Sequence, residues 1–311
     1  MMKLLFTRLA IAAALALAVT APATARSAKP GAHALVKSAA DGHGKAKRAQ
    51  RHRARPPRLA RPVVLRSGAF LVLDPATGEV LYQKNAGMVM PIASVTKLMT
   101  ALVVISAGQN MSEMLEISNA DVDRLKYSSS RLRVGTRLTR SAMLHIALMS
   151  SENRAASALG RHYPGGTARF VRAMNAKAQM LGMRNSLFVE PTGLSSANVS
   201  TPEDLARLVV AAQQQPLIRK YSTDRDHTIA QGRLRTAYRN SNRLIASAGW
   251  QIGMQKTGYI AEAGRCMVLH ARVKGRAVVM VFLDAHGKFA RARDANQVRS
   301  WLVGGKKAGQ R

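Results

Sequence analysis

Two apolar runs near the end of the chain, Cys266-Met-Val-Leu-His-Ala-Arg-Val273 and Ala277-Val-Val-Met-Val-Phe-Leu283, flank the short segment Lys274-Gly-Arg276. Apolar runs of this length around a glycine-containing turn are typical of a β-hairpin. A second pair of runs, Ala69–Asp74 and Glu79–Gln83, surrounds another Pro/Gly turn. We expect these two hairpins, from opposite ends of the folded part of the chain, to form one antiparallel sheet.

Helical periodicity dominates the sequence between the hairpins. The stretches with helical spacing of apolar residues are Ser94–Ile105, Arg140–His162, Thr167–Leu181 and Thr201–Gln213. A further amphipathic helix, Ala290–Leu302, is expected to close the domain. The expected fold class is therefore α/β (α+β), with an antiparallel sheet formed by both termini, helices flanking it, and a helical lobe.

The first 25 residues have the three parts of a secretory signal peptide. Lys3 and Arg8 supply the positive region, the apolar run Leu9–Val19 follows, and small residues lead to Ala25. The apolar run is too short for a membrane span, which needs about 20 residues. We expect cleavage after Ala25 and export of the mature chain, so no nucleic acid is expected as a partner.

Residues 26–66 are expected to form a disordered basic linker, because prolines and basic residues are mixed there without apolar periodicity. The whole chain has a formal net charge of +32, and residues 67–311 hold 34 basic and 15 acidic side chains. The linker is either a tether to an anionic lipid or wall surface or a solvated spacer. Residues 67–303 are expected to form one domain, and residues 304–311 a flexible tail.

The first of three short motifs is Ser94-Val-Thr-Lys97, which precedes the apolar run Leu98–Ile105. Ser94 is placed near a helix start, and Lys97 lies three residues later on the same helix face. A lysine in this position can accept the serine proton if burial lowers its pKa toward neutrality. Taken alone, the motif also fits a capping serine with a surface lysine.

The second motif is Ser151-Glu-Asn153, in which a hydroxyl and an amide could move a proton and bind a substrate amide. The same spacing recurs at Ser196-Ala-Asn198 in a loop rich in glycine and serine, where an ordinary turn is the preferred interpretation.

The third motif is Lys256-Thr-Gly258, within an expected strand. A lysine and a hydroxyl there can hold a carboxylate, and glycine lets a substrate approach the backbone.

Together, Ser-x-x-Lys at a helix start, Ser-x-Asn and Lys-Thr-Gly on a strand resemble the signature of the penicillin-binding and serine β-lactamase superfamily. The local sequences narrow the resemblance to the serine D-Ala-D-Ala peptidases, low-molecular-weight penicillin-binding proteins, and among these to D-alanyl-D-alanine endopeptidases of the penicillin-binding protein 7 type. These sequences are Pro91–Ala101, Met149–Ala156, Glu190–Leu194 and Lys256–Cys266. The resemblance covers about residues 67–302 and implies a β-lactamase/transpeptidase-like fold.

The resemblance also implies roles for individual residues. Ser94 would be the nucleophile that forms an acyl-enzyme with a D-alanyl carbonyl, Lys97 its general base, and Ser151 the proton relay to the leaving amine. Asn153 would orient the substrate amide. The remaining expected substrate-binding residues are Lys256, Thr257, Gly258 and Tyr259, and the backbone N–H groups of Ser94 and Tyr259 would form the oxyanion hole.

Three other functions are compatible with part of the sequence. A D-alanyl-D-alanine carboxypeptidase shares the motifs, and so does a β-lactamase, which needs a Glu and Asn pair to activate water. Glu190 lies in the corresponding region without a paired Asn in Glu190–Leu194, which favours a loop residue that bonds locally. A non-catalytic wall-binding protein would explain the charge but not the ordered motifs.

No metal or organic cofactor is expected, since the eight histidines include no close pair on one helix face beside an acid. The only cysteine, Cys266, is expected to pack in its strand. The expected function is thus a periplasmic serine D,D-peptidase, soluble or loosely membrane-associated. Its expected partners are peptidoglycan peptide stems, β-lactams as covalent inhibitors, and an anionic wall or membrane surface through electrostatic contact.

Overall fold

The computed structural model describes residues 63–232 and 234–304. The expected signal peptide, the linker up to residue 62 and the tail from residue 305 lie outside the described residues. In the part of the chain that is described, no helix is both long and apolar enough to span a bilayer.

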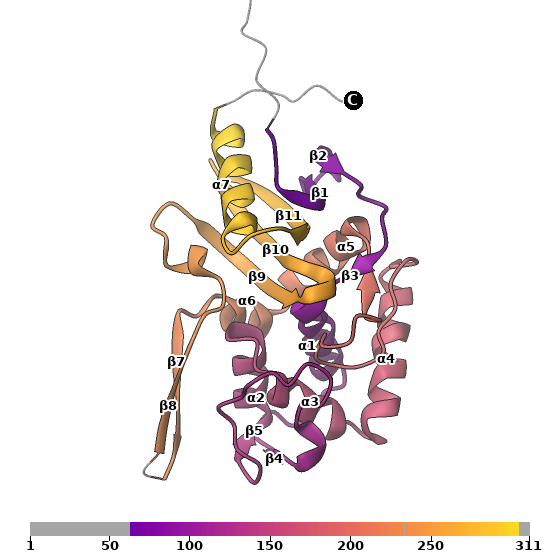
Figure 1. Cartoon of the computed structure of the whole chain (residues 1–311), viewed down its shortest axis with the longest axis vertical. Helices are drawn as coiled ribbons and strands as arrows, with labels where there is room; N and C mark the ends of the chain where they lie inside the picture. Colours follow the sequence, from indigo (N-terminus) through magenta and orange to yellow (C-terminus); the bar gives the residue numbers. More distant parts are fainter. Residues whose placement is uncertain (1–62, 233, 305–311) are drawn as a thin grey trace, which may run out of the picture. The chain divides into compact units, whose positions relative to one another are not determined.

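The central sheet joins the two ends of the domain, as the sequence predicts (Figure 1). Its strand order is β2-β1-β11-β10-β9, and each neighbouring pair is antiparallel. In the register of β1 with β11, Ala69 lies opposite Leu283 and Leu73 opposite Val279. The strands of this sheet are β1 (Ser67–Leu73), β2 (Val80–Lys84), β9 (Gln251–Ile260), β10 (Gly264–Val273) and β11 (Arg276–Ala285).

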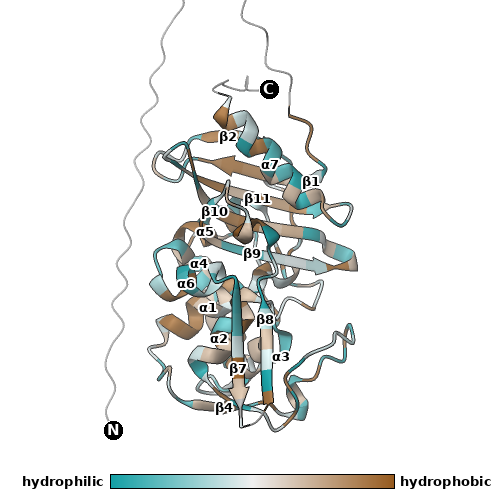
Figure 2. Cartoon of the chain, turned by 90° about the vertical axis from the view of Figure 1, so that its left-hand side faces the viewer, coloured by the Kyte–Doolittle hydropathy of each residue, from teal (hydrophilic) through white to brown (hydrophobic). Residues whose placement is uncertain are grey.

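The three middle strands β1, β11 and β10 are buried on both faces, which explains why they contain continuous apolar runs rather than alternating ones. Ala69 and Leu71 pack toward the helical side, in one hydrophobic cluster with Leu205 of α5. Phe70 and Val72 face the other way and pack with Val298 of α7. Figure 2 shows the strands of this sheet coloured largely as hydrophobic.

Helices form the second lobe and cover the sheet (Figure 1). They are α1 (Thr96–Ser106), α2 (Arg140–Met149), α3 (Asn153–Arg161), α4 (Gly166–Met180), α5 (Pro202–Gln213), α6 (Pro216–Thr223) and the closing helix α7 (Ala290–Val303). The start of α5 follows the sequence signal, because the Thr201 side chain accepts a hydrogen bond from the Asp204 N–H and Pro202 occupies the first turn.

The expectation of one helix over Arg140–His162 is wrong in its middle. The chain leaves α2 at Ser150 and starts α3 at Asn153, with Glu152 capping the Arg154 N–H. Ser151 between them has φ +66°, which no helix accommodates. The break turns Ser151 out of the helix pair.

Three further antiparallel strand pairs in the described part of the chain lie outside the central sheet and were not expected from the sequence. These are β3 (Met90–Pro91) with β6 (Val199–Ser200), β4 (Met114–Glu116) with β5 (Arg137–Thr139), and β7 (Asp226–Gln231) with β8 (Leu234–Arg239). The strands β3 to β6 have only two or three residues, too few for the alternation of side chains to be recognised. The hairpin of β7 and β8 has six residues in each strand and was not predicted.

A buried carboxylate ties the first strand to the last helix. Asp294 of α7 accepts hydrogen bonds from the Ser67 N–H at 2.8 Å, the Ser67 hydroxyl at 2.6 Å and the Arg66 N–H at 3.0 Å. The Tyr82 hydroxyl donates to the Val63 carbonyl. Residues 63–66, which the sequence places in the linker, therefore lie against the domain.

Candidate active site

Ser94 lies in a short 3-10 turn, Ala93–Val95, immediately before α1. The sequence places it at a helix start, and the regular helix begins two residues later. Ala93 has φ +47°, so a residue with a side chain is held in the left-handed region just before the serine. Strained backbone of this kind is characteristic of functional sites. The same holds for Ser151 in the second motif.

Lys97 is in the first turn of α1, and its side chain is buried. Its Nζ lies 2.9 Å from Ser94 Oγ, 2.8 Å from Asn153 Oδ1 and 2.5 Å from the Thr192 carbonyl oxygen. The amide and backbone carbonyl oxygens can only accept hydrogen bonds. When the amine is neutral, its two N–H groups therefore donate to Asn153 and Thr192, and its lone pair is directed at the Ser94 hydroxyl.

Burial lowers the pKa of Lys97 to about 8, while the carboxylates of Glu190, Glu152 and Asp123 act in the opposite direction. A base with a pKa close to neutrality combines a usable neutral fraction with sufficient basicity. A lysine in this motif can act as a base only if it is buried, and Lys97 is buried.

Ser151 and Lys256 form a second serine–lysine pair on the opposite side of the cleft. Lys256 Nζ lies 2.9 Å from Ser151 Oγ and 2.8 Å from the Thr257 carbonyl oxygen. Burial holds the pKa of Lys256 well below its usual value, and the charges of Lys97 and Arg291 lower it further. The Ser151 hydroxyl is thus placed next to a group that can exchange protons with it.

Strand β9 carries the third motif along the free edge of the sheet. The Thr257 hydroxyl donates to Ser241 Oγ at 2.7 Å, and the Tyr259 side chain is exposed. A Cβ added to Gly258 would lie 2.9 Å from the Ser94 backbone nitrogen. The edge of β9 therefore passes directly beside the N–H of Ser94, where the resemblance places the oxyanion hole.

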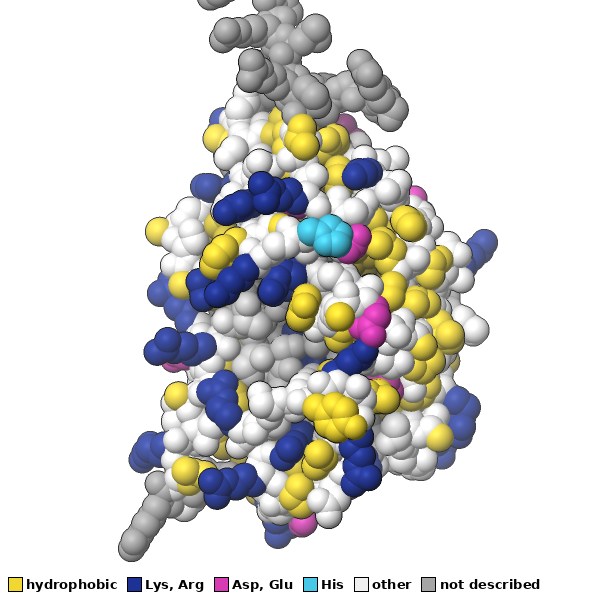
Figure 3. All heavy atoms as spheres, viewed as in Figure 1, with side chains coloured by type: hydrophobic (Ala, Val, Ile, Leu, Met, Phe, Trp, Pro, Cys, Tyr) yellow, Lys and Arg dark blue, Asp and Glu magenta, His cyan; other side chains and the backbone are white. Residues whose placement is uncertain are grey.

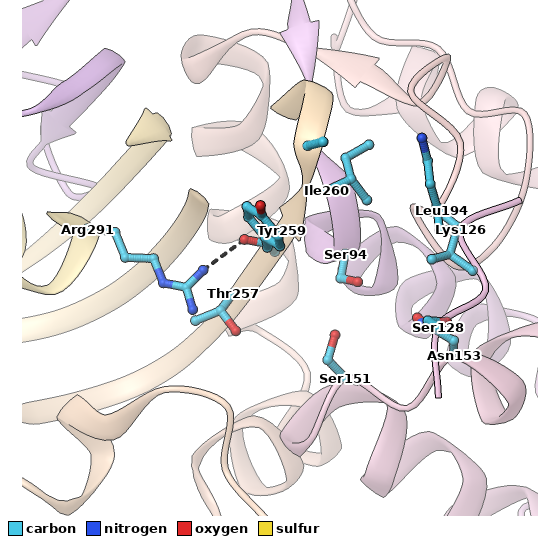
Figure 4. Close-up of a pocket in the computed structure, with 12 residues that line it drawn as sticks. Ser94, Lys126, Ser128, Ser151, Asn153, Leu194, Thr257, Tyr259, Ile260 and Arg291 are labelled. Carbon is cyan, nitrogen blue, oxygen red and sulfur yellow. Dashed lines mark hydrogen bonds between the residues drawn. The ribbon is translucent and has the colours of Figure 1, made fainter. Parts of the chain in front are cut away.

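The structure brings the sequence-predicted residues to one cleft between the sheet and the helical lobe. The cleft has a volume of about 520 Å³, and Figure 3 shows Lys and Arg side chains around the hollow on this face. In Figure 4, Ser94, Ser151 and Thr257 surround the cleft from three different elements. Ser94, Ser151, Asn153, Thr257, Gly258 and Tyr259 line it, and the buried amines of Lys97 and Lys256 reach the two serines from behind.

Arg291 is a lining residue that sequence reasoning missed. It comes from the first turn of α7, and its guanidinium donates to the Gly258 carbonyl at 2.8 Å and to the Cys266 carbonyl at 3.1 Å (Figure 4). It therefore supports the backbone of β9 and places a positive charge beside the cleft. One arginine among many in a basic helix carries no signal in the sequence.

The loop before β5 supplies further residues at the site, for which the sequence carries no recognisable motif. Ser128 Oγ accepts a hydrogen bond from Asn153 Nδ2 at 2.9 Å and donates to Asp123 at 2.6 Å. These two hydrogen bonds fix the orientation of the Asn153 amide, so that its oxygen faces Lys97. Lys126 of the same loop forms an ion pair with Glu262 beyond β9.

Two expectations about neighbouring residues are resolved. The expectation that Glu190 bonds locally in its loop is confirmed, because its carboxylate accepts hydrogen bonds from Thr192 and Gly193. The segment Glu190–Leu194 contains no asparagine, but Asn198 Nδ2, from further along the loop, donates to the same carboxylate at 2.9 Å. Asn198 lies eight residues after Glu190 in the sequence, and the loop between them folds so that the two side chains meet. Cys266 is fully buried, and burial raises the pKa of its thiol to about 12, which agrees with a packing role.

The pH dependence of acylation should report Lys97. Because the lysine must be neutral to accept the Ser94 proton, the second-order rate of labelling by a penicillin should rise about tenfold per pH unit below about 8 and level off above it. Lys97→Arg, which stays protonated, should lower the rate at least about 1000-fold. Lys84→Arg on exposed β2 is the control, and a rate independent of pH between 6 and 9 would contradict the assignment.

Gly258→Ala tests whether the close approach of β9 to Ser94 is needed for acylation. The new Cβ would lie 2.9 Å from Ser94 N and 3.0 Å from the Ile92 carbonyl, so β9 must shift away from the nucleophile. We expect labelling by penicillin to slow by roughly 100-fold, the effect of losing one oxyanion donor. Gly87→Ala, where no atom lies within 4 Å of the new Cβ, is the matched control. Wild-type labelling by Gly258→Ala would show that β9 does not form the hole.

Comparison with known proteins shows the family of this chain. The D-alanyl-D-alanine carboxypeptidase family, Peptidase S11, matches residues 55–287. A D-alanyl-D-alanine endopeptidase of Pseudomonas aeruginosa is 46% identical over 254 residues, which is 80% of this chain and 82% of the relative. One of Escherichia coli is 43% identical over 242 residues, 77% of this chain and 78% of the relative.

Solved structures give the same result. The Streptomyces K15 DD-transpeptidase has a TM-score of 0.72 at 27% identity, covering 78% of this chain and 98% of that chain. Penicillin-binding protein D2 of Listeria monocytogenes, in its cefotaxime-bound form, has a TM-score of 0.68 at 29% identity, covering 79% and 100%. The fold class and family resemblance expected from the sequence are confirmed, and this chain belongs to the Peptidase S11 family of D-alanyl-D-alanine carboxypeptidases.

Proposed function

We propose that the protein is a serine D,D-peptidase that hydrolyses peptidoglycan peptides through an acyl-enzyme on Ser94. The observation that carries the proposal is the Lys97 amine, which lies 2.9 Å from Ser94 Oγ and donates its other hydrogen bonds to two carbonyl oxygens. The relatives from Pseudomonas aeruginosa and Escherichia coli, at 46% and 43% identity, are named D-alanyl-D-alanine endopeptidases. We therefore favour endopeptidase action on D-Ala–diaminopimelate cross-links, with carboxypeptidase action as the second candidate because carboxypeptidases are also among the relatives.

In the acylation step, Lys97 takes the Ser94 proton as Oγ attacks the D-alanyl carbonyl carbon. The carbonyl oxygen becomes an oxyanion beside the backbone N–H groups of Ser94 and Tyr259. Ser151, hydrogen-bonded to Lys256, gives its proton to the leaving amine as the amide bond breaks, and Lys256 can replace that proton.

Before deacylation, Lys97 releases to solvent the proton that it took from Ser94, which its lowered pKa favours. The neutral amine can then accept a proton from an attacking water and pass it to Ser94 Oγ. The water adds to the ester carbonyl, the bond to Ser94 Oγ breaks, and Oγ regains a proton. The products are a free D-alanyl carboxylate and, from the first step, a free amine.

A digest of purified cross-linked muropeptides tests this function. The wild-type protein should convert dimers to monomers, and Ser94→Ala should do so at no measurable rate because the nucleophile is absent. Liquid chromatography with mass detection follows both reactions. Release of terminal D-alanine from pentapeptides without cleavage of dimers would overturn the endopeptidase assignment in favour of the carboxypeptidase. Rapid hydrolysis of penicillin would instead support a β-lactamase.

We also propose export to the periplasm, on the basis of the signal-like residues 1–25, and electrostatic contact with anionic wall or membrane surfaces. Residues 67–311 carry 34 basic and 15 acidic side chains, in addition to the basic segment before them. Charge attraction between exposed groups is screened by salt over a Debye length of about 10 Å at 0.1 M.

Co-sedimentation of the protein with purified wall sacculi should therefore fall steeply as salt is raised from low concentration to about 0.5 M. Ser94→Ala is the appropriate form for this measurement, since it leaves the substrate intact. Binding that does not depend on ionic strength would contradict the electrostatic contact.

A further inference from the structure

Glu190 is the most heavily hydrogen-bonded carboxylate beside the cleft among those described here, and the catalytic chemistry above does not use it. Its Oε2 accepts from the Thr192 N–H and the Thr192 hydroxyl, each at 2.6 Å. Its Oε1 accepts from the Gly193 N–H at 2.6 Å, Asn198 Nδ2 at 2.9 Å and the Ser195 N–H at 3.3 Å. The loop from Glu190 to Asn198 is thus folded around one carboxylate.

These contacts leave Glu190 no free acceptor position. A carboxylate offers about four lone-pair directions, and five protein donors already point at this one. A general base for water needs an open position that the water can reach. The Glu190–Asn198 pair therefore differs in function from the Glu and Asn pair that activates water in class A β-lactamases.

Thr192 connects Glu190 to the catalytic base. Its N–H and hydroxyl are held by Glu190, and its carbonyl oxygen accepts the Lys97 amine at 2.5 Å. The preceding Pro191 carbonyl accepts from the Thr100 hydroxyl of α1 at 2.7 Å. The Thr192 carbonyl shares its peptide plane with the Gly193 N–H, which donates to Glu190 at 2.6 Å. Rotation of this plane would break both the Lys97 contact and the bond to Glu190, and the two bonds from Thr192 to Glu190 hold the adjoining residue in place.

The loop is also fitted closely against the nucleophile turn. Gly193 has φ +81°, and a Cβ at this position would lie 2.0 Å from the Ala93 carbonyl oxygen. No side chain fits there, so the loop and the turn that carries Ser94 cannot move independently at this point. The Gly193 N–H itself donates to Glu190.

The charge of Glu190 faces the same amine. The groups that act on Lys97 are Glu190 from the loop, Glu152 at the start of α3, Asp123 before β5 and Lys256 on β9. Glu190 is the strongest of the three carboxylates in raising the pKa of Lys97, and it offsets part of the lowering that burial causes. Removing its negative charge must lower that pKa further.

We propose that Glu190 is a positioning residue for the general base: its carboxylate holds Thr192 and Gly193 so that the Thr192 carbonyl directs the Lys97 amine at Ser94. The proposal rests on the proposed function, because it assigns Lys97 as the base. Glu190 acts through Thr192 and Lys97 and does not itself touch the reacting atoms.

The experiment compares the full-length mature chain with Glu190→Gln, Glu190→Asp and the matched control Glu203→Gln, which removes an exposed carboxylate from α5. The second-order rate of acylation by a fluorescent penicillin is measured from pH 5.5 to pH 10, and loss of the label is followed after removal of free drug. Thermal melting establishes that each variant is folded.

Glu190→Gln should lower the alkaline plateau of acylation by about tenfold to a hundredfold, the range expected for a displaced catalytic group. The pH at which the acylation rate falls to half of its plateau should also be lower, because Lys97 without the Glu190 charge stays neutral at lower pH. Glu190→Asp keeps the charge but retracts the carboxylate, so it should lower the plateau and leave the midpoint in place. Glu203→Gln should change neither.

Three results would overturn the proposal. An unchanged midpoint in Glu190→Gln would show that the charge does not act on the base, and the loop contacts would then be merely structural. Normal acylation with slow loss of the label would make Glu190 the base for water. If Glu190→Gln does not fold, the Glu190→Asp variant decides: an acylation rate at alkaline pH equal to that of the wild type would show that Glu190 does not position Thr192. Absence of labelling in the wild-type protein would refute the proposed function instead.

Discussion

A buried lysine held beside a serine by two carbonyl oxygens is the constraint on which the rest of this site depends. Lys97 can serve as a base only if water is kept away from its amine, and a desolvated amine requires hydrogen-bond partners. Asn153 and Thr192 supply them at 2.8 and 2.5 Å. Since these residues lie on α3 and on the loop before β6, three distant segments of the chain must meet at one atom.

The neighbouring elements follow from that requirement. The helix break at Ser150–Glu152 brings Asn153 and Ser151 to the cleft, and the left-handed backbone at Ser151 aims its hydroxyl toward Lys256. Two buried lysines then share one site, which raises the electrostatic cost of protonating either of them. The carboxylates of Glu190, Glu152 and Asp123 counterbalance this accumulation of positive charge around Lys97.

The sheet holds the third motif, Lys256–Gly258, in place beside the cleft. Strand β9 is an edge strand, so its outer side is free to face the cleft, and its inner side is paired with β10 along its length. Arg291 from α7 supports the backbone at Gly258. Asp294 of the same helix is bonded to the start of β1. The ends of the domain therefore stabilise each other and the wall of the active-site cleft.

The amino-acid sequence by itself determined both hairpins, most helices and the motif residues Ser94, Lys97, Ser151, Asn153, Lys256 and Thr257. Hydrophobic runs, caps and turn residues act over a few positions, so their effect is visible locally. Only the tertiary structure decided the interruption between α2 and α3, the pairing of Glu190 with Asn198, and the roles of Ser128 and Arg291. Each of these depends on contacts between segments distant in sequence, where the geometry of hydrogen bonds and burial, and not local preference, selects the conformation.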